Sequence, residues 1–508
     1  MGDVEPPAER GGRFAAGRGM IDGAYLGADR LIDRGQHHAF RLLWLFLPET
    51  SIARNPRFQQ IMASRLFSDA GQQALLYGAL IAVVRNGGSA FDAALIGVAT
   101  LIPAAALGLY GGAVADALPK RVALAAIYNL QALLCFTVPA AFGTDLPAVL
   151  FLIFAVHSLG QVSGPTESAV LPLVANEEQL ASAASLVSLA SNIGTVLGTA
   201  ILAPVLVRVF GVEPLFFVAG VLLLLAASRV FDLATVQRRR PMDWRRPNLR
   251  LRATVEWLAH ERAVATMMIV GVVAGTANIV VQTMAPRYVQ AVLHVDPADS
   301  VYVFAPSAAG LLIALLATPP LIRLRGERFV ALMGFAFVTA VLVLLGLVDR
   351  RLAEMIDPVN PMRVLGLFGI ALSDELRTAG ALAIPLGFGL SSITLSVQTY
   401  INRRVPLSYQ GRAFALQSSI KNAAAIVPLL TLGAAAGVFG VEQVLVAAPF
   451  VLLFVAAGLV QLSFAFGPEK APRRFDVLST FWLESEAPVG SPDDETASGR
   501  ASASGAER

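Results

Sequence analysis

The sequence contains little cysteine, little charge and almost no lysine. Cys135 is the only cysteine among 508 residues, which excludes an intramolecular disulfide framework and a paired-thiol metal site. Charged residues make up 15% of the chain, whereas soluble globular proteins carry about 25%. Of the 39 basic residues, only Lys120, Lys421 and Lys470 are lysines. The shortage of charge excludes an ordinary soluble domain.

Apolar residues are abundant and occur in long runs. They make up 56% of the chain, and the mean hydropathy is +0.64. In lipid every backbone polar group needs a partner, so each crossing must be a helix of roughly 20 residues or a strand of a closed barrel. The runs lack the alternation of barrel strands. The sequence therefore predicts an all-α polytopic membrane protein.

Hydropathy windows predict twelve membrane-spanning helices in two groups of six. The first group is expected at 58–85, 91–115, 121–142, 147–172, 180–208 and 213–231, and the second at 264–290, 302–322, 329–348, 379–402, 411–438 and 441–466. The predicted domains are an N-terminal segment, 1–57, with a short interfacial helix; two halves, 58–232 and 263–467; a basic linker, 233–262; and a largely disordered tail, 468–508.

The distribution of basic residues predicts the orientation in the membrane. The net charge is only +3, and arginines gather in particular loops and in the linker, as topology signals do; we expect no nucleic-acid partner. Both termini are expected in the cytoplasm, in a multi-pass protein of the cell membrane. No cleavable signal peptide is predicted. Four arginines lie in the stretch Asp349–Thr378, which this orientation places outside the cell. They weaken the predicted orientation but do not change it.

A short polar gap separates the second and third predicted spans. It reads Gly112-Ala-Val-Ala-Asp116-Ala-Leu-Pro119-Lys120-Arg121. Asp116 can latch the inner ends of the two halves through charge and helix-dipole contacts, so we expect Gly112, Asp116, Lys120 and Arg121 to form a conformational gate. The alternative is that the two basic residues only set the topology.

The spacing of this gap resembles the loop between spans 2 and 3 of the major facilitator superfamily. Three further motifs resemble the drug-efflux branch that includes macrolide and siderophore exporters: Ser68-Asp69-Ala-Gly71, Gly164-Pro165 and Val405 to Arg412. Bacterial lysophospholipid transporters look similar in the same regions. The resemblance covers about residues 55–467 and implies twelve helices in two pseudo-symmetric halves.

The chain also departs from these antiporters. They often carry Gly-x-x-x-Gly-Pro in span 5, whereas here Thr199 follows Gly194-x-x-x-Gly198. Many also have a buried arginine in span 4, where the nearest candidate here is His157. Both departures count against proton antiport.

Among the ionisable residues of the predicted spans, where a charge costs roughly 2.5 to 3.5 kcal/mol, three stand out. Asp69 is a candidate site for a proton or a substrate. The alternative is that it makes a hydrogen bond that fixes span 1 against span 5 or 11. Glu167 is a candidate gate residue, or else an interfacial acid paired with a cytoplasmic arginine. Lys421 is a candidate titrating or substrate-contacting residue, or else the ion-pair partner of Asp69 or Glu167.

Neutral polar residues complete the predicted cavity. Gln72 and Gln73 share a polar stripe with Asp69, and His157 is either a proton relay or a neutral helix-packing donor. The remaining candidates are Gln282, Gln398 and Asn422. No catalytic residue, metal site, nucleotide motif or cofactor is expected, so an enzyme is not predicted.

The first hypothesis is a secondary transporter that exports an amphipathic small molecule by alternating access, with protons as the expected coupling ion. The second keeps the fold and changes the cargo to a lysophospholipid or another single-chain lipid. The third is a non-transporting membrane sensor or scaffold that binds partners through its linker and termini.

Overall fold

The computed structural model describes residues 52–117, 119–176, 179–231, 251–348, 350–364, 372–451 and 454. Within these ranges every regular element is a helix, so the predicted all-α fold is confirmed. The predicted interfacial helix in 1–57, most of the linker and the tail 468–508 lie outside the described residues. The side chains of 109–118 are also outside them.

The first half consists of long helices joined by short turns. Its elements are η1 (Ile52–Arg54), α2 (Pro56–Arg85), α3 (Ala90–Ala117), α4 (Lys120–Phe142), α5 (Leu146–Ser168), α6 (Leu171–Val174), α7 (Leu180–Val196), the π-helix η3 (Leu197–Leu202), α8 (Ala203–Val209) and α9 (Glu213–Phe231). Asn55 caps α2, because its side chain accepts a hydrogen bond from the backbone N–H of Arg57 at 3.1 Å and Pro56 follows it at the first helical position.

The second half repeats this pattern after a short amphipathic helix. Its elements are α10 (Leu251–His260), α11 (Arg262–Ala291), η4 (Pro297–Asp299), α12 (Ser300–Phe304), α13 (Ser307–Arg325), α14 (Glu327–Gly346), α15 (Arg350–Ile356), η5 (Asp357–Val359), η6 (Pro361–Arg363), α17 (Asp374–Arg404) and α18 (Leu407–Phe439). A further apolar helix follows at Val441–Val451. The sequence places the start of span 10 at 379, but α17 begins at Asp374 because Ser373 caps it and accepts from Leu376 N at 3.2 Å.

Ten helices of the described chain are long and apolar enough to cross a membrane. Helix α2 has 30 residues but is not among the ten; it carries Arg57, Arg65 and Asp69. The last predicted span, 441–466, is described continuously only to residue 451. The predicted spans therefore agree with the helices, while the count of twelve exceeds the ten that apolarity alone identifies.

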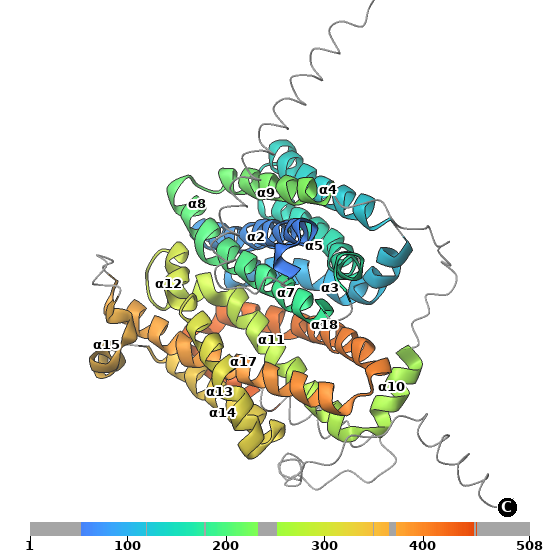
Figure 1. The fold of residues 1–508 in the computed structure, drawn as a ribbon. Coiled ribbons are helices and arrows are strands. Elements are labelled where there is room, and N and C mark those ends of the chain that lie inside the picture. The colour runs from blue at the N-terminus through green and yellow to red at the C-terminus, as the bar shows by residue number, and fades with distance from the viewer. Residues whose placement is uncertain are drawn as a thin grey trace, which may run out of the picture.

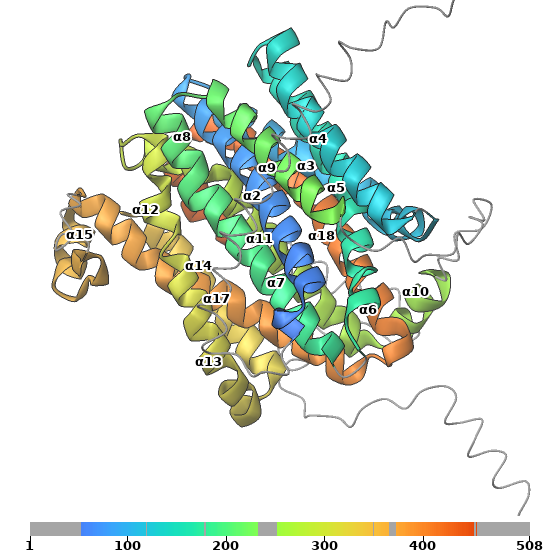
Figure 2. The same cartoon turned by 45° about the horizontal axis from the view of Figure 1, so that its top comes forward.

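Two clusters of buried side chains form separate cores, one for each half. Figure 1 shows the helices of the first half above those of the second half, and Figure 2 shows the same helices after a turn of 45°. The same pairings recur in both: α3 and α4 pack on α5, and α13 and α14 pack on α17. The halves meet mainly along α3 and α18, and α11 contacts both α2 and α3. A small third cluster, including Ala94, Val280 and Leu429, fills this seam. Repeated pairings of this kind are what two related six-helix halves produce.

Candidate functional site

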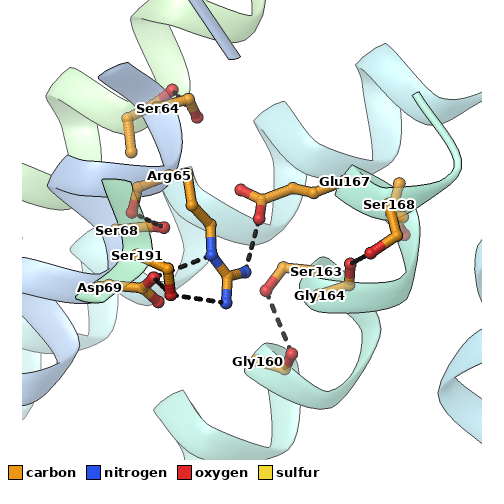
Figure 3. Close-up of polar contacts among 12 residues, drawn as sticks. Ser64, Arg65, Ser68, Asp69, Gly160, Ser163, Gly164, Glu167, Ser168 and Ser191 are labelled. Atoms are coloured by element: carbon orange, nitrogen blue, oxygen red, sulfur yellow. Dashed lines mark hydrogen bonds and ion pairs between the residues drawn. The ribbon is translucent and has the colours of Figure 1, made fainter. Parts of the chain in front are cut away.

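A half-buried arginine on α2 joins two carboxylates on different helices. Arg65 Nε lies 2.8 Å from Asp69 Oδ2, one helical turn further along α2, and Arg65 Nη1 lies 2.5 Å from Glu167 Oε2 on α5 (Figure 3). The side chains of Glu167, Asp69 and Arg65 are 4%, 15% and 25% exposed. The guanidinium, a rigid fork of donors, suits such a two-sided bridge.

Two hydroxyl groups extend this arrangement to further helices. Ser191 on α7 donates to Asp69 Oδ2 at 2.5 Å, and the buried Tyr128 on α4 donates to Glu167 Oε1. Arg65 Nη2 also donates to Ser191 Oγ at 3.4 Å. We call Arg65, Asp69, Tyr128, Glu167 and Ser191 the Arg65 cluster. It connects α2, α4, α5 and α7.

The Arg65 cluster contains more acid than base. With both carboxylates ionised, one guanidinium faces two negative charges, so the cluster carries a net charge of −1. Binding of a single proton makes it neutral. Because unbalanced charge inside a membrane is costly, an arrangement of this kind is suited to gaining and losing one proton.

Two glycines on the fifth span bring Ser191 to Asp69. A Cβ on Gly194 would lie 2.6 Å from the carbonyl oxygen of Leu66, and one on Gly198 would lie 2.5 Å from that of Ala70. Only glycine permits backbones to approach so closely. The Gly194-x-x-x-Gly198 motif therefore packs the fifth span against α2, and the π-helix η3 begins directly before Gly198.

The structure gives both predicted acids partners on other residues of the first half. Asp69 accepts the hydrogen bond from span 5 that was one expectation, while Glu167 pairs with Arg65 of span 1 rather than with a cytoplasmic arginine. The expectation that Lys421 pairs with either acid is wrong, because Arg65 occupies both. Lys421 lies instead against Gly275 of α11.

Sequence reasoning missed Arg65, Tyr128 and Ser191. Arg65 carried a usable signal, since it precedes Asp69 by four residues and that spacing places two side chains on one helix face. Tyr128 and Ser191 gave no signal, because hydroxyl groups are common in membrane helices.

The predicted glutamine stripe divides between two neighbours. Gln72 lies against Gly160 of α5, whereas Gln73 lies against Gly198. The Nδ1 atom of His157 is 3.0 Å from the carbonyl oxygen of Ile153 on its own helix, as expected for a neutral packing residue.

The remaining cavity candidates lie in the second half, away from the Arg65 cluster. Gln282 is exposed and donates to Asn278 Oδ1 at 3.2 Å. Gln398 is exposed and Asn422 is half-buried. No group of three or more potential metal ligands occurs in the described part of the chain.

The predicted gate is only partly described. Gly112 and Asp116 fall in α3, but their side chains lie outside the described residues. Lys120 is buried and begins α4, and Arg121 follows it. The gating role of these four residues stays a prediction.

Polar contacts between described residues join the two halves near the last turns of α2, a region that we call the Arg85 end. Arg208 Nη1 lies 2.6 Å from Asp299 Oδ1, and Arg85 Nε lies 3.7 Å from Asp296 Oδ2. Tyr77 donates to Ser300, and Gln290 donates to the carbonyl oxygen of Val84, at 3.3 and 3.2 Å. In this conformation the halves are closed at the Arg85 end.

Structures of known transporters share this fold. A nucleoside transporter is 14% identical with a TM-score of 0.57, covering 82% of this chain and 100% of its own. A bacterial homologue of the human lysosomal transporter Spinster, inward-facing and unoccupied, is 12% identical with a TM-score of 0.62, covering 85% and 100%. A D-xylose–proton symporter is 12% identical with a TM-score of 0.56, covering 81% and 98%. No curated protein sequence matches significantly.

Family comparison agrees with the fold. The family described as Major Facilitator Superfamily matches residues 61–427, which span both helical halves and the Arg65 cluster. A polytopic membrane protein of this family moves a small molecule across the bilayer and is not expected to be an enzyme. The chain therefore belongs to the Major Facilitator Superfamily of secondary transporters.

Proposed function

We propose that the protein exports an amphipathic small molecule across the cell membrane by alternating access, driven by protons that enter through the Arg65 cluster. The observation that carries this proposal is the pairing of one guanidinium with two carboxylates. One proton neutralises the excess negative charge of the cluster. Because the hydrogen bonds of the cluster join α2, α4, α5 and α7, a change in these bonds affects all four helices.

Asp69 is the better entry point for the proton. Its side chain is 15% exposed, against 4% for Glu167. A protonated, uncharged Asp69 is a weaker acceptor for the hydroxyl of Ser191, so the contact between α2 and α7 weakens. Glu167 keeps Arg65 in place meanwhile. Proton binding is thereby linked to the packing of the first half, and rocking of the two halves carries the cargo.

A change of Asp69 tests this proposal. Purified protein is reconstituted in vesicles that contain a pH-sensitive dye, and a macrolide, a hydroxamate siderophore or lysophosphatidylglycerol is added. We expect cargo-dependent proton flux with the wild type and its loss in Asp69→Asn. Glu354→Gln, a change at an exposed acid on α15, is the matched control and should behave as the wild type. Equal flux in Asp69→Asn and wild type would show that the coupling role is wrong.

A lysophospholipid is the second candidate cargo. It is favoured by an apolar pocket in the second half, lined by residues that include Met284, Phe304, Leu342, Val444 and Leu445. A single acyl chain suits such a lining. Lipid movement in proteoliposomes without a proton gradient would favour this cargo. The sensor or scaffold hypothesis rests on termini outside the described residues.

A further inference from the structure

Lys421 is a charged side chain near the middle of α18 with no partner in the described part of the protein. It is half-buried, and no hydrogen bond or ion pair joins it to another described residue. Asp69 and Glu167, the two acids that the sequence offered as its partners, are both engaged by Arg65. An ammonium group inside a span is costly, and such residues normally pair with one another or face a substrate pathway.

The aliphatic stem of Lys421 is held by a glycine on the facing helix. A Cβ on Gly275 of α11 would lie 2.4 Å from Cδ and 2.9 Å from Cγ of Lys421. One turn earlier, Gly271 makes the same room for Gln417, whose Nε2 would lie 2.3 Å from an added Cβ. The two glycines therefore fix the paths of two polar side chains, which leaves Lys421 little freedom to reach the membrane surface.

The first half contains a corresponding contact between a glycine and a charged residue, but there the charged residue is on the first span and the glycine is on the fifth. Asp69 is the fourteenth residue of α2 (56 to 69), and Gly275 is the fourteenth residue of α11 (262 to 275). In the first half a glycine of the fifth span, Gly194, faces the charged residue of α2; in the second half a glycine of α11 faces the charged residue of α18. The two charges are opposite in sign, and among the described residues only the first has a partner of opposite charge.

Lys421 also lies at the level where the halves meet. Ser419, two residues earlier, and Gln161 of α5 both approach Gly108 of α3. A Cβ on Gly108 would lie 3.5 Å from the side-chain oxygen of Ser419 and 3.6 Å from that of Gln161. Transporters with related halves bind their cargo at the interface of the repeats, near the middle of the membrane.

We infer that Lys421 binds an anionic group of the cargo, a carboxylate or a phosphate. The ammonium offers three N–H donors to anionic oxygens, and Asn422 and Gln417 place amide groups close by in the chain. This inference rests on the proposed transport function and adds the charge of the cargo to it. The anion belongs either to a soluble amphipathic acid or to a lipid headgroup.

Chemical labelling tests the inference without requiring transport. Protein in phosphatidylcholine nanodiscs is treated with an amine-reactive reagent, and the labelling rates of Lys421, Lys120 and Lys470 are read by peptide mass spectrometry. The probes are decanoate, lysophosphatidylglycerol and decyltrimethylammonium. At ten times its dissociation constant a bound anion should slow labelling of Lys421 about tenfold, while Lys470 and the cation experiment serve as references. Protection by decanoate identifies a soluble acid, and protection by lysophosphatidylglycerol alone identifies a lipid headgroup.

Variants give a second readout, the rise in melting temperature that decanoate or lysophosphatidylglycerol causes. Lys421→Arg should retain this rise and Lys421→Met should lose it. Arg350→Met removes one positive charge from an exposed position on α15 and should retain it. Absence of protection at Lys421, or an equal rise in Lys421→Met, would overturn the inference.

The two proposals fail separately. Binding in nanodiscs needs no proton gradient, so a normal proton flux in Asp69→Asn leaves anion binding intact. Intact proton-coupled transport of a cationic compound, with no anion binding, would overturn the role of Lys421 alone.

Discussion

At the scale of single residues, Arg65 determines whether two acids can stay buried. Asp69 and Glu167 come from different helices, and the guanidinium is the one cation that contacts both among the described residues. A buried ion pair is weak evidence for stability, but removing one partner leaves an uncompensated charge and is strongly destabilising.

Replacement of Arg65 by methionine should therefore destabilise the protein. We expect Arg65→Met to lower the free energy of unfolding by about 3 to 5 kcal/mol, measured by thermal unfolding in detergent. The triple variant Arg65→Met/Asp69→Asn/Glu167→Gln should recover part of this loss because no charge remains unpaired.

The control for this prediction is an exposed ion pair. Arg350 and Glu354 on α15 are 85% and 67% exposed and lie 3.2 Å apart. Arg350→Met should change stability by less than about 1 kcal/mol. A similar small effect of Arg65→Met would mean that the Arg65 cluster does not stabilise the first half.

At the scale of elements, the fit of the fifth span against α2 decides the geometry of the site. Helix α7 continues through the π-helix η3 into α8, and Gly194 and Gly198 lie against the backbone of α2. π-Helical segments within α-helices are frequently found at functional sites. Here the segment lies beside the glycine that fixes how close the two helices come.

An added methyl group at this contact should separate the helices. In Gly198→Ala the new Cβ would lie 2.5 Å from Ala70 O and 2.9 Å from Ala74 N, so the backbone must move. We expect a loss of about 1 to 3 kcal/mol in stability, together with weaker binding of Ser191 to Asp69 and lower transport.

Gly437 provides the matched glycine on α18. It has no atom within 4 Å of an added Cβ, so Gly437→Ala should change stability by no more than about 1 kcal/mol. Equal melting temperatures and transport rates for the two variants would contradict the packing role of Gly198.

At the scale of the whole molecule, the contacts at the Arg85 end hold one of the two conformations that alternating access requires. Arg208 and Asp299 belong to different halves, and the contact between them must open when the cargo site faces the other side. The pair is partly exposed, so it contributes on the order of 0.2 to 1 kcal/mol. At the upper end of that range, about 1 kcal/mol, a balanced equilibrium shifts about fivefold.

Reversing one charge should open this end. We expect Arg208→Asp to increase the population with a long distance between spin labels at Val209 and Met355, measured by double electron–electron resonance in a Cys135→Ala background. The double variant Arg208→Asp/Asp299→Arg should restore the wild-type distribution. Arg350→Asp, which breaks a pair inside the second half, should leave it unchanged. An unchanged distribution in Arg208→Asp would show that the pair does not hold this end closed.

Much of the fold was predictable because lipid imposes simple requirements. Every crossing must satisfy its own backbone hydrogen bonds, so long apolar runs become helices. The predicted spans at 121–142 and 213–231 match α4 and α9 within a residue. Asp69 and Glu167 were identified by the same reasoning, since charge within an apolar run stands out.

The sequence by itself determined the helices, their grouping into halves and the presence of costly charges within the spans, because these follow from local composition. Only the tertiary structure decided which charges meet. Arg65 pairs with both acids, whereas Lys421 lies against Gly275. The pairing depends on glycine contacts between helices that are separated by more than 100 residues along the chain. Close approach of helix backbones in three dimensions has no signature in the charges themselves, and for this reason the predicted pairing of Lys421 was wrong.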